Sequence, residues 1–228
     1  MKEFHSHKSH TPYRTYTPYR PHLSFIIYSL LFIISFCLCS CSENEAYDPY
    51  EDWEARNTEW FKHVADTART AINAARAQYG DSWEEHCDWR MYKSLRKSPT
   101  FQSGLVYDSI CVRIINKGTG TTLPKSTETV RVAFRGWLIP TTDENGRVFE
   151  KVFAQTFYGA FDPQTAAYAD ATPGSYTEGF GTALQYMPEG AEWIVCIPYQ
   201  QFYGETAQGD GNIPAYSAAR FRIIRMKM

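Results

Sequence analysis

Between Trp53 and Tyr79 the apolar residues recur at the spacing of one face of an α-helix. The stripe consists of Trp53, Trp60, Phe61, Val64, Ala68, Ala71, Ile72, Ala75 and Tyr79. Alanine-rich sequence within this range favours a helix, and Gly80 followed by Asp81 is a plausible end. One helix cannot bury its own stripe. It is therefore expected to dock on the domain that follows or on a second copy of the chain, which leaves a homodimer open.

From Phe101 onward the pattern changes to short apolar runs separated by turns, which is typical of β-strands. In residues 128–139 apolar and polar positions alternate, with Val130, Val132 and Phe134 on one face. Further strands are expected in residues 105–115, 192–198 and 219–227, and one short helix in residues 179–187. Several strands with one short helix predict an antiparallel α+β domain in residues 99–228, preceded by a helical segment in residues 53–98.

The N-terminal region carries an uncharged apolar run of 17 residues, Leu23 to Cys39, preceded by four basic residues and one acid. A charged segment followed by an apolar one is typical of a signal peptide. The alternative is a permanent membrane anchor, because a run of this length lies at the short end of the range of about 17–25 residues that spans a bilayer. The residues that end the run favour the signal peptide.

The run ends in the sequence LCSC, Leu38 to Cys41, which resembles the lipobox of bacterial lipoproteins. The resemblance implies that residues 1–40 are removed as a signal peptide and that Cys41 is acylated. Residues 41–52 would then be the lipidated cysteine and its tether, and the acyl chains would anchor the protein to a membrane. The acidic SENE sequence after Cys41 resembles a surface-export signal, or is a polar tether. The expected location is the cell envelope, with the lipid anchor in the outer membrane.

The net charge and the cysteine count limit the ligands and the disulfides that this chain could have. From Cys41 to Met228 there are 19 Lys and Arg against 24 Asp and Glu, a net charge of −5 that gives no electrostatic case for nucleic-acid binding. Besides Cys41, this part of the chain has Cys87, Cys111 and Cys196, an odd number that leaves at least one free thiol. No zinc-binding spacing and no hydrolase motif is present, so no metal and no cofactor are expected.

Five segments in the second half of the chain, taken in order, resemble FKBP-type peptidyl-prolyl isomerases. The sequence VRVAFRGWL is similar to the family pattern V-x-V-x-Y-x-G-x-L, and GRVFE at Gly146 to Glu150 is similar to G-x-x-F-D. The remaining three are GLVYDSICVRIINKGTG, YTEGFGTALQYMPEGAEWIVCIPYQQFYG and GNIPAYSAARFRIIRMKM. The resemblance implies an antiparallel sheet wrapped around one short helix. It also implies an enzyme that rotates X-Pro bonds in proline-containing polypeptides such as exported proteins.

The resemblance also implies the site residues. They are Phe134, Phe149, Glu150, Tyr176, Thr177, Phe180, Tyr203, Ile213 and Phe221. Phe180 would form the pocket floor, where the family usually has Trp, and three other phenylalanines would form the walls. The hydroxyl of Tyr203 and the backbone N–H of Thr177 would donate hydrogen bonds to the substrate. Glu150 would stand at the acid position beside the pocket.

Several positions depart from the family pattern. Phe134 stands where the family usually has Tyr, and Phe202 stands where it has Ala and could narrow the pocket. The stretch from Gln155 to Tyr176 is longer than its family counterpart. An open apolar pocket favours an active isomerase. A pocket plugged by Phe202 or by the long stretch favours the alternative, an inactive binding or chaperone lipoprotein with the same fold.

Overall fold

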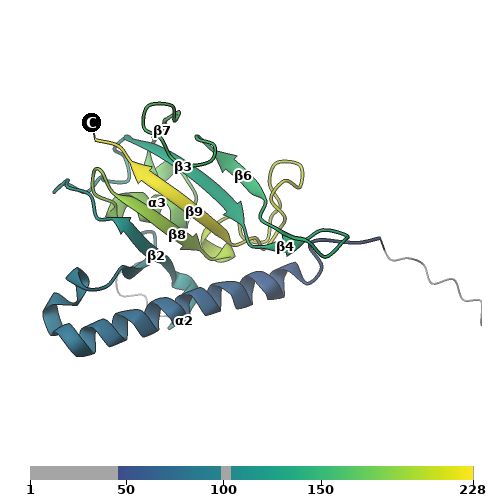
Figure 1. Ribbon diagram of the computed structural model, residues 1–228, viewed down its shortest axis with the longest axis horizontal. Helices are drawn as coiled ribbons and strands as arrows, with labels where there is room; N and C mark the ends of the chain where they lie inside the picture. Colours follow the sequence, from purple (N-terminus) through teal and green to yellow (C-terminus); the bar gives the residue numbers. More distant parts are fainter. Residues whose placement is uncertain (1–45, 99–103, 228) are drawn as a thin grey trace, which may run out of the picture. The chain divides into compact units, whose positions relative to one another are not determined.

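The computed structural model describes residues 46–98 and 104–227. Within it, Tyr47–Met228 form one compact unit whose centre is an antiparallel sheet with the strand order β1, β2, β8, β9, β3, β6, and with β7 also paired to β3 (Figure 1). Two short strands, β4 and β5, form a separate hairpin. The strands are β1 (Trp89–Lys93), β2 (Ser109–Asn116), β3 (Val130–Leu138), β4 (Thr141–Thr142), β5 (Val148–Phe149), β6 (Val152–Gln155), β7 (Ala169–Ala171), β8 (Glu192–Ile197) and β9 (Ala219–Arg225).

Helices cover both faces of this sheet. The helices are α2 (Trp53–Tyr79) and α3 (Glu178–Tyr186), with short 3-10 turns η1 (Gly80–Glu85), η2 (Val106–Asp108), η3 (Pro173–Ser175) and η4 (Tyr199–Gln201). Residues of α3 pack with Ile110, Val112 and Val195 in the main core, while α2 packs on Cys111 and Cys196 on the opposite face. The predicted α+β fold, with an antiparallel sheet around one short helix after a helical segment, is confirmed.

The helix α2 begins and ends where the apolar stripe predicts. Asp52 precedes it in a left-handed conformation with φ 52°, and Gly80, with φ 56°, ends it and donates its N–H to the carbonyl of Arg76. A positive φ is accessible to glycine at little cost, which explains the stop at this residue.

The prediction that the helical segment extends to residue 98 is wrong. After η1, residues Trp89–Lys93 form β1, which pairs antiparallel with β2 at one edge of the sheet. Trp89 and Met91 pack against α2, and Tyr92 stacks on Tyr186 of α3, so alternate side chains do serve opposite faces. The expected boundary between residues 98 and 99 therefore does not separate two domains, since Tyr47–Met228 form one unit.

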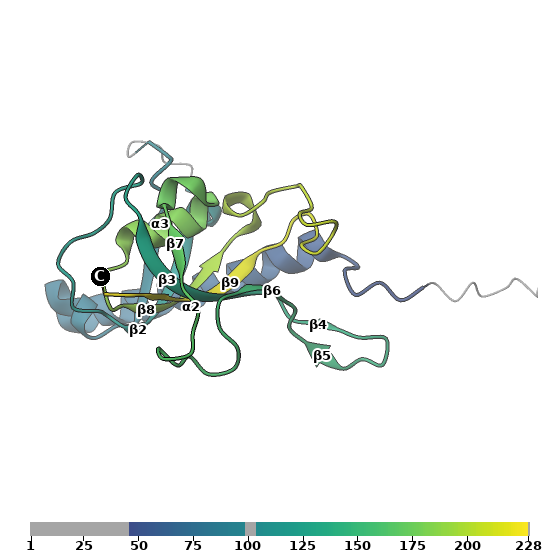
Figure 2. The same ribbon diagram turned by 90° about the horizontal axis from the view of Figure 1, so that it is seen from above.

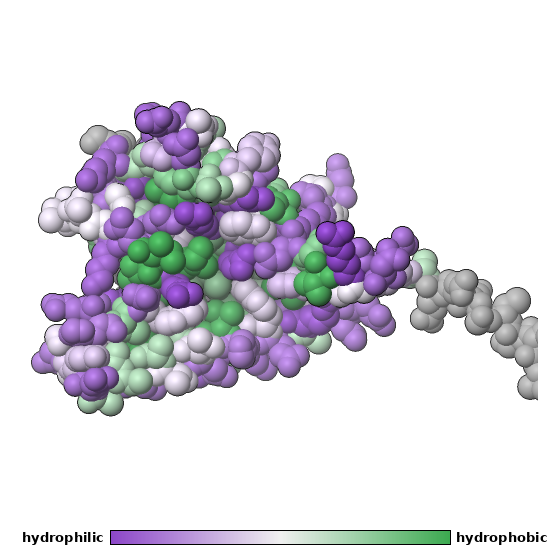
Figure 3. Space-filling model, viewed as in Figure 1, coloured by the Kyte–Doolittle hydropathy of each residue, from purple (hydrophilic) through white to green (hydrophobic). Residues whose placement is uncertain are grey.

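The apolar stripe of α2 is buried against the sheet of its own chain. Phe61, Ala65 and Ala68 are at most 1% exposed and pack on Cys111 and Cys196. On the side of this helix that Figure 3 shows, the surface is a mixture of polar and weakly apolar residues. The stripe was expected to dock either on the following domain or on a second copy of the chain. The structure shows the first arrangement, and dimerisation stays a prediction.

Buried polar groups fix the N-terminal half of α2 on the sheet. The amide of Asn57, fully buried, donates to the carbonyl of Trp53 at 2.6 Å and accepts from the N–H of Ala218 at 2.8 Å. The indole N–H of Trp53 donates to the hydroxyl of Ser217 at 2.9 Å. Because a buried polar group is costly when unpaired, these bonds specify one register of the helix.

The first part of the long stretch Gln155–Tyr176, around Phe157, packs on the face of the sheet opposite α3. Phe157 is 4% exposed and clusters with Phe161, Ala133 and Ile224 on the outer side of β3 and β9. Figure 2 shows α3 on one side of the sheet and the loop between β6 and β7 on the other. This part of the insertion therefore lies away from the face that carries the short helix, to which the chain returns at Ala171.

In the described residues no helix is long and apolar enough to span a bilayer, and no group of His, Cys, Asp and Glu could hold a metal ion. The predicted signal peptide, residues 1–40, and the predicted lipidated Cys41 lie outside the described residues.

Candidate active site

An aromatic pocket of about 100 Å³ lies between the N-terminus of α3, the strands β3, β6 and β9, and the turn after β8. It is lined by Phe134, Phe153, Ala154, Tyr176, Thr177, Phe180, Phe202, Tyr203 and Phe221. Six of the nine predicted site residues are in this set. They come from separate parts of the chain and are brought together by the pairing of β3 with β9 and by the docking of α3 on the sheet.

Phe180 forms the floor of the pocket and is 2% exposed. The rings of Phe134 and Phe221 meet it edge-on, at centroid distances of 5.7 Å and 4.9 Å, and Tyr176 stacks over it at 5.0 Å. Such edge-to-face pairs are the preferred arrangement of aromatic rings and each contributes about 0.5–1.5 kcal/mol beyond the area it buries. The floor is therefore already formed without a ligand.

A glycine allows two wall rings to come close to the sheet. A Cβ atom on Gly136 of β3 would lie 2.6 Å from Cε1 of Phe221 and 2.8 Å from Cζ of Phe153. The absence of a side chain at this position therefore lets both rings pack against the strand. This is a physical reason for glycine in the strand sequence VRVAFRGWL.

The polar groups of the pocket are few and stand at its rim. Thr177 is the residue before α3, its backbone N–H makes no bond among the described residues, and its Oγ1 is buried without a partner there. Tyr203 is 40% exposed, and its hydroxyl also has no hydrogen-bond partner in the described ranges. The backbone N–H of Thr177 and the hydroxyl of Tyr203 are therefore free to bind a ligand, and their role in substrate binding stays a prediction.

The family model of FKBP-type peptidyl-prolyl cis-trans isomerases matches residues 120–224, which include all nine lining residues. This part of the chain belongs to that family. The matched segment begins near the Gly turn after β2 and ends within β9.

Curated relatives agree with this assignment. The chain is 32% identical over 122 residues to the FKBP-type 22 kDa peptidyl-prolyl cis-trans isomerase of Escherichia coli, which covers 54% of this chain and 48% of that protein. It is 33% identical over 101 residues to the probable FKBP-type 25 kDa isomerase of Pseudomonas aeruginosa, covering 44% and 36%. The chain thus spans half or less of the length of these relatives.

A solved structure of a peptidyl-prolyl cis-trans isomerase from Pseudomonas syringae is similar at a TM-score of 0.42 and 22% identity. That match covers 80% of this chain and 97% of the other.

Two predicted pocket residues of the FKBP-type domain, Phe149 and Glu150, are placed elsewhere. Phe149 is 39% exposed on β5 and contributes to a shallow hollow with Tyr47 at the β4–β5 hairpin. Glu150 forms an ion pair with Arg220 at 2.7 Å and lines no part of the aromatic pocket. The prediction of a wall and an acid at these positions is wrong, because the hairpin carries them away from α3.

Phe153 and Ala154 of β6 take the two places instead. Phe153 meets Phe221 edge-on at 5.4 Å, and Ala154 pairs with Gly136 of β3, facing the pocket. The sequence VFEKVFA contains Val-Phe twice, at Phe149 and at Phe153. The family pattern G-x-x-F fits Phe149, because Gly146 stands three residues before it. The second copy lies in the strand beside β3, so this domain has Ala where the family pattern has an acid.

Ile213 does not line the pocket either. It is 8% exposed and packs in a neighbouring cluster with Trp53, Leu138 and Ala218. The pocket residues Phe153 and Phe202 pack against this cluster. The prediction of Ile213 as a site residue, at the apolar position before Pro214, is therefore corrected to a supporting contact.

Phe202 narrows the pocket without filling it. Its ring lies 5.5 Å from Phe153, 4.3 Å from Tyr203 and 6.0 Å from Phe221, as one more side wall. No residue of the insertion between Phe157 and Pro173 lines the pocket among the described residues. Of the two obstructions considered from the sequence, neither closes the site.

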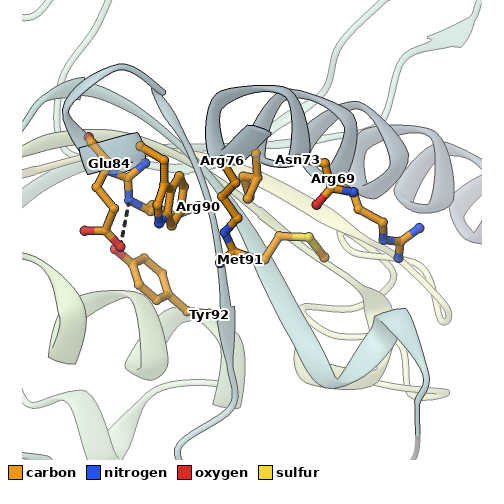
Figure 4. Close-up of a pocket in the computed structure, with 9 residues that line it drawn as sticks. Arg69, Asn73, Arg76, Glu84, Arg90, Met91 and Tyr92 are labelled. Atoms are coloured by element: carbon orange, nitrogen blue, oxygen red, sulfur yellow. Dashed lines mark hydrogen bonds and ion pairs between the residues drawn. The ribbon is translucent and has the colours of Figure 1, made fainter. Parts of the chain in front are cut away.

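A second hollow, of about 250 Å³, lies between α2 and β1 and contains three arginines (Figure 4). Arg76 and Arg90 stand over the ring of Trp83, at 4.6 Å and 4.7 Å. Arg90 is 5% exposed and donates to the backbone carbonyls of Cys87, Trp89 and Glu84 at 2.6–2.7 Å. This guanidinium therefore holds the turn into β1 in shape and is not available to a ligand.

Proposed function

We propose that this chain accelerates the cis–trans isomerisation of X-Pro peptide bonds. The observation that carries the proposal is the pre-formed pocket in which Phe134 and Phe221 meet the floor ring of Phe180 edge-on. Its volume of about 100 Å³ suits one small ring. For scale, an apolar protein cavity of about 150 Å³ binds benzene.

The reaction needs no nucleophile. An X-Pro bond rotates over a barrier of about 18–20 kcal/mol that amide resonance sets, and no covalent bond breaks. In the proposed complex the prolyl ring lies on Phe180. The backbone N–H of Thr177 and the hydroxyl of Tyr203 hold carbonyl oxygens of the substrate on either side of the ring. An apolar wall of Phe153, Ala154 and Phe202 favours the twisted amide, which is less polar than the planar one, and such preference for the transition state is catalysis.

The direct test is a prolyl isomerisation assay with the purified full chain and a short peptide that contains one X-Pro bond. The expected result is a rate that rises linearly with protein concentration above the uncatalysed rate. Binding of the peptide, measured by calorimetry, without any acceleration would favour the second reading, a binding or chaperone protein. The observation behind that reading is the narrowing of the pocket by Phe202 together with Ala154 at the acid position.

We also propose that the chain acts in the cell envelope, on exported proline-containing polypeptides, as a lipoprotein anchored in the outer membrane through Cys41. The support is the LCSC sequence after the apolar run of residues 23–39. Mass spectrometry of the protein from membranes of its own host should find a chain that begins at an acylated Cys41. An intact N-terminus or an unmodified Cys41 would contradict the proposal.

The isomerisation rate is expected to vary little between about pH 6 and pH 8, because no proton is transferred when an amide rotates. The pocket lining contains Phe, Ala, Tyr and Thr, with no His, acid, Lys, Arg or Cys. The histidines between Cys41 and Met228, His63 and His86, lie on α2 and just after η1. The check is the ratio of catalysed to uncatalysed rate across this range, and a bell-shaped curve would point to a titrating group in the mechanism.

A further inference from the structure

Two cysteines lie directly opposite each other on neighbouring strands. Cys111 of β2 and Cys196 of β8 are paired residues of the antiparallel ladder, and both are free thiols. Paired residues share one face of a sheet, and their Cα atoms are about 4.5–5.5 Å apart. A disulfide needs Cα atoms about 4.4–6.8 Å apart with Cβ atoms on the same side. The pairing therefore meets the Cα requirement. The Cβ atoms of directly opposite residues are about 4.5–5.5 Å apart, so they must come slightly closer to reach the distance of about 3.5–4.5 Å in a disulfide.

The helix α2 covers both thiols. Cys111 is 0% and Cys196 4% exposed, and they pack beneath Phe61, Ala65 and Ala68. Burial raises the pKa of the Cys196 thiol to about 12, and it raises the pKa of the Cys111 thiol as well, with a further contribution from Cys196. Only the thiolate attacks a disulfide, so exchange is slow while α2 is docked.

The third thiol is separated from this pair. Cys87 lies before β1, packs with Ile72 and Ala75 at the C-terminal end of α2, and its Sγ contacts the carbonyl of Trp89. The residue of β1 paired with Cys111 is Met91. Register thus selects Cys111 and Cys196 as partners and leaves Cys87 as the odd thiol.

We propose that Cys111 and Cys196 are a covalent modification site, oxidised to a cross-strand disulfide by a disulfide-containing oxidant before α2 docks or whenever it lifts. One thiolate attacks the S–S bond of the oxidant and releases a thiol, and the second cysteine then displaces the other half. The two cysteines lose two protons and two electrons in total, and the oxidant is reduced to two thiols. The oxidising envelope proposed above holds such oxidants, but the geometry does not depend on that location.

The disulfide would join two central strands of the sheet. The strand β8 leads directly into the turn that carries Phe202 and Tyr203 of the pocket. A link between Cys111 and Cys196 closes a long segment of chain, and such links stabilise chiefly by restricting the unfolded state. The oxidised chain should therefore unfold at a higher denaturant concentration than the reduced chain.

Tryptic peptide mapping of the full chain can test the link, because trypsin places the three cysteines on separate peptides, residues 77–90, 98–113 and 152–220. The chain is incubated with oxidised glutathione, free thiols are alkylated, and the digest is analysed without reductant. The expected product joins peptides 98–113 and 152–220 within one chain and weighs two hydrogen atoms less than their sum, with the cysteine of 77–90 alkylated. A link that includes residues 77–90, a link only between chains, or no link after unfolding and refolding in the oxidant would overturn the proposal.

Two pairs of variants test the cysteine pair and its covering helix separately. Cys87→Ser should leave the link unchanged, while Cys196→Ser should remove it and leave Cys111 open to alkylation in denaturant. Phe61→Ala, which weakens the docking of α2, should raise the rate of link formation in the folded chain several-fold relative to the exposed neighbour variant Lys62→Ala. Equal rates in these two variants would show that α2 does not control access to the thiols.

Discussion

Replacing Phe180 by Ala is expected to lower kcat/KM for prolyl isomerisation by at least about tenfold, which corresponds to about 1.4 kcal/mol of lost transition-state stabilisation. The ring is the pocket floor, and three other rings pack against it at centroid distances of 4.9–5.7 Å. Its removal takes away the surface on which the prolyl ring would lie and also loosens the walls. The effect on the rate should therefore exceed that of any polar substitution in the domain.

The same change also destabilises the fold, since truncating a buried Phe costs about 3–5 kcal/mol. Phe157→Ala is the matched control, because Phe157 is 4% exposed and packs on the outer face of the sheet, away from the pocket. Both variants should lose similar stability in a denaturant titration, while only Phe180→Ala loses activity per folded molecule. Phe180→Trp, which restores the usual family residue, should remain active. Equal activity of folded Phe180→Ala and the parent chain would remove Phe180 from the mechanism.

The fold could be predicted from the sequence wherever the apolar residues of an element recur at the regular spacing of a helix or a strand. The stripe of α2 and the alternation in β3 show directly which side chains face inwards. The strand β1 gives only a weak signal, because it has five residues and the alternation of Trp89, Arg90 and Met91 breaks at Tyr92. Arg90 is nevertheless buried, since its guanidinium is satisfied by three backbone carbonyls. That arrangement exists only once the turn before β1 has formed, so no local pattern reveals it.

Site residues could be predicted where a residue of the family motif lies on a helix or strand that the sequence pattern also predicts. Phe134, Phe180 and Phe221 lie on elements with clear patterns, and the structure brings them together. Phe149 was misplaced because two Val-Phe pairs compete for one motif, and only the pairing of β6 with β3 selects Phe153. The first pair is β5 of the β4–β5 hairpin and the second opens β6. The length and direction of that hairpin follow from tertiary packing that a single sequence does not specify.

Whether α2 belongs to the FKBP-type domain or is only an attachment can be decided by Phe61→Ala. Phe61 is 1% exposed and packs on the sheet through Cys111 and Cys196, so the variant should lose about 3–5 kcal/mol of unfolding free energy. The loss should appear in one cooperative transition, because α2 and the sheet form one compact unit. Lys62→Ala, at the exposed neighbouring position, should change stability by less than about 0.5 kcal/mol.

The measurement compares two probes during chemical unfolding. Far-ultraviolet circular dichroism reports mainly on helix, most of which is α2, and the isomerisation rate reports on the pocket, whose lining includes no residue of α2. Coincident transitions that shift together in Phe61→Ala would make α2 a part of the folding unit. A helix that melts first, while isomerisation continues at the parent rate, would instead restore the boundary between residues 98 and 99. The pocket would then be stable without α2, since its nine lining residues all come from the sheet, α3 and their connections.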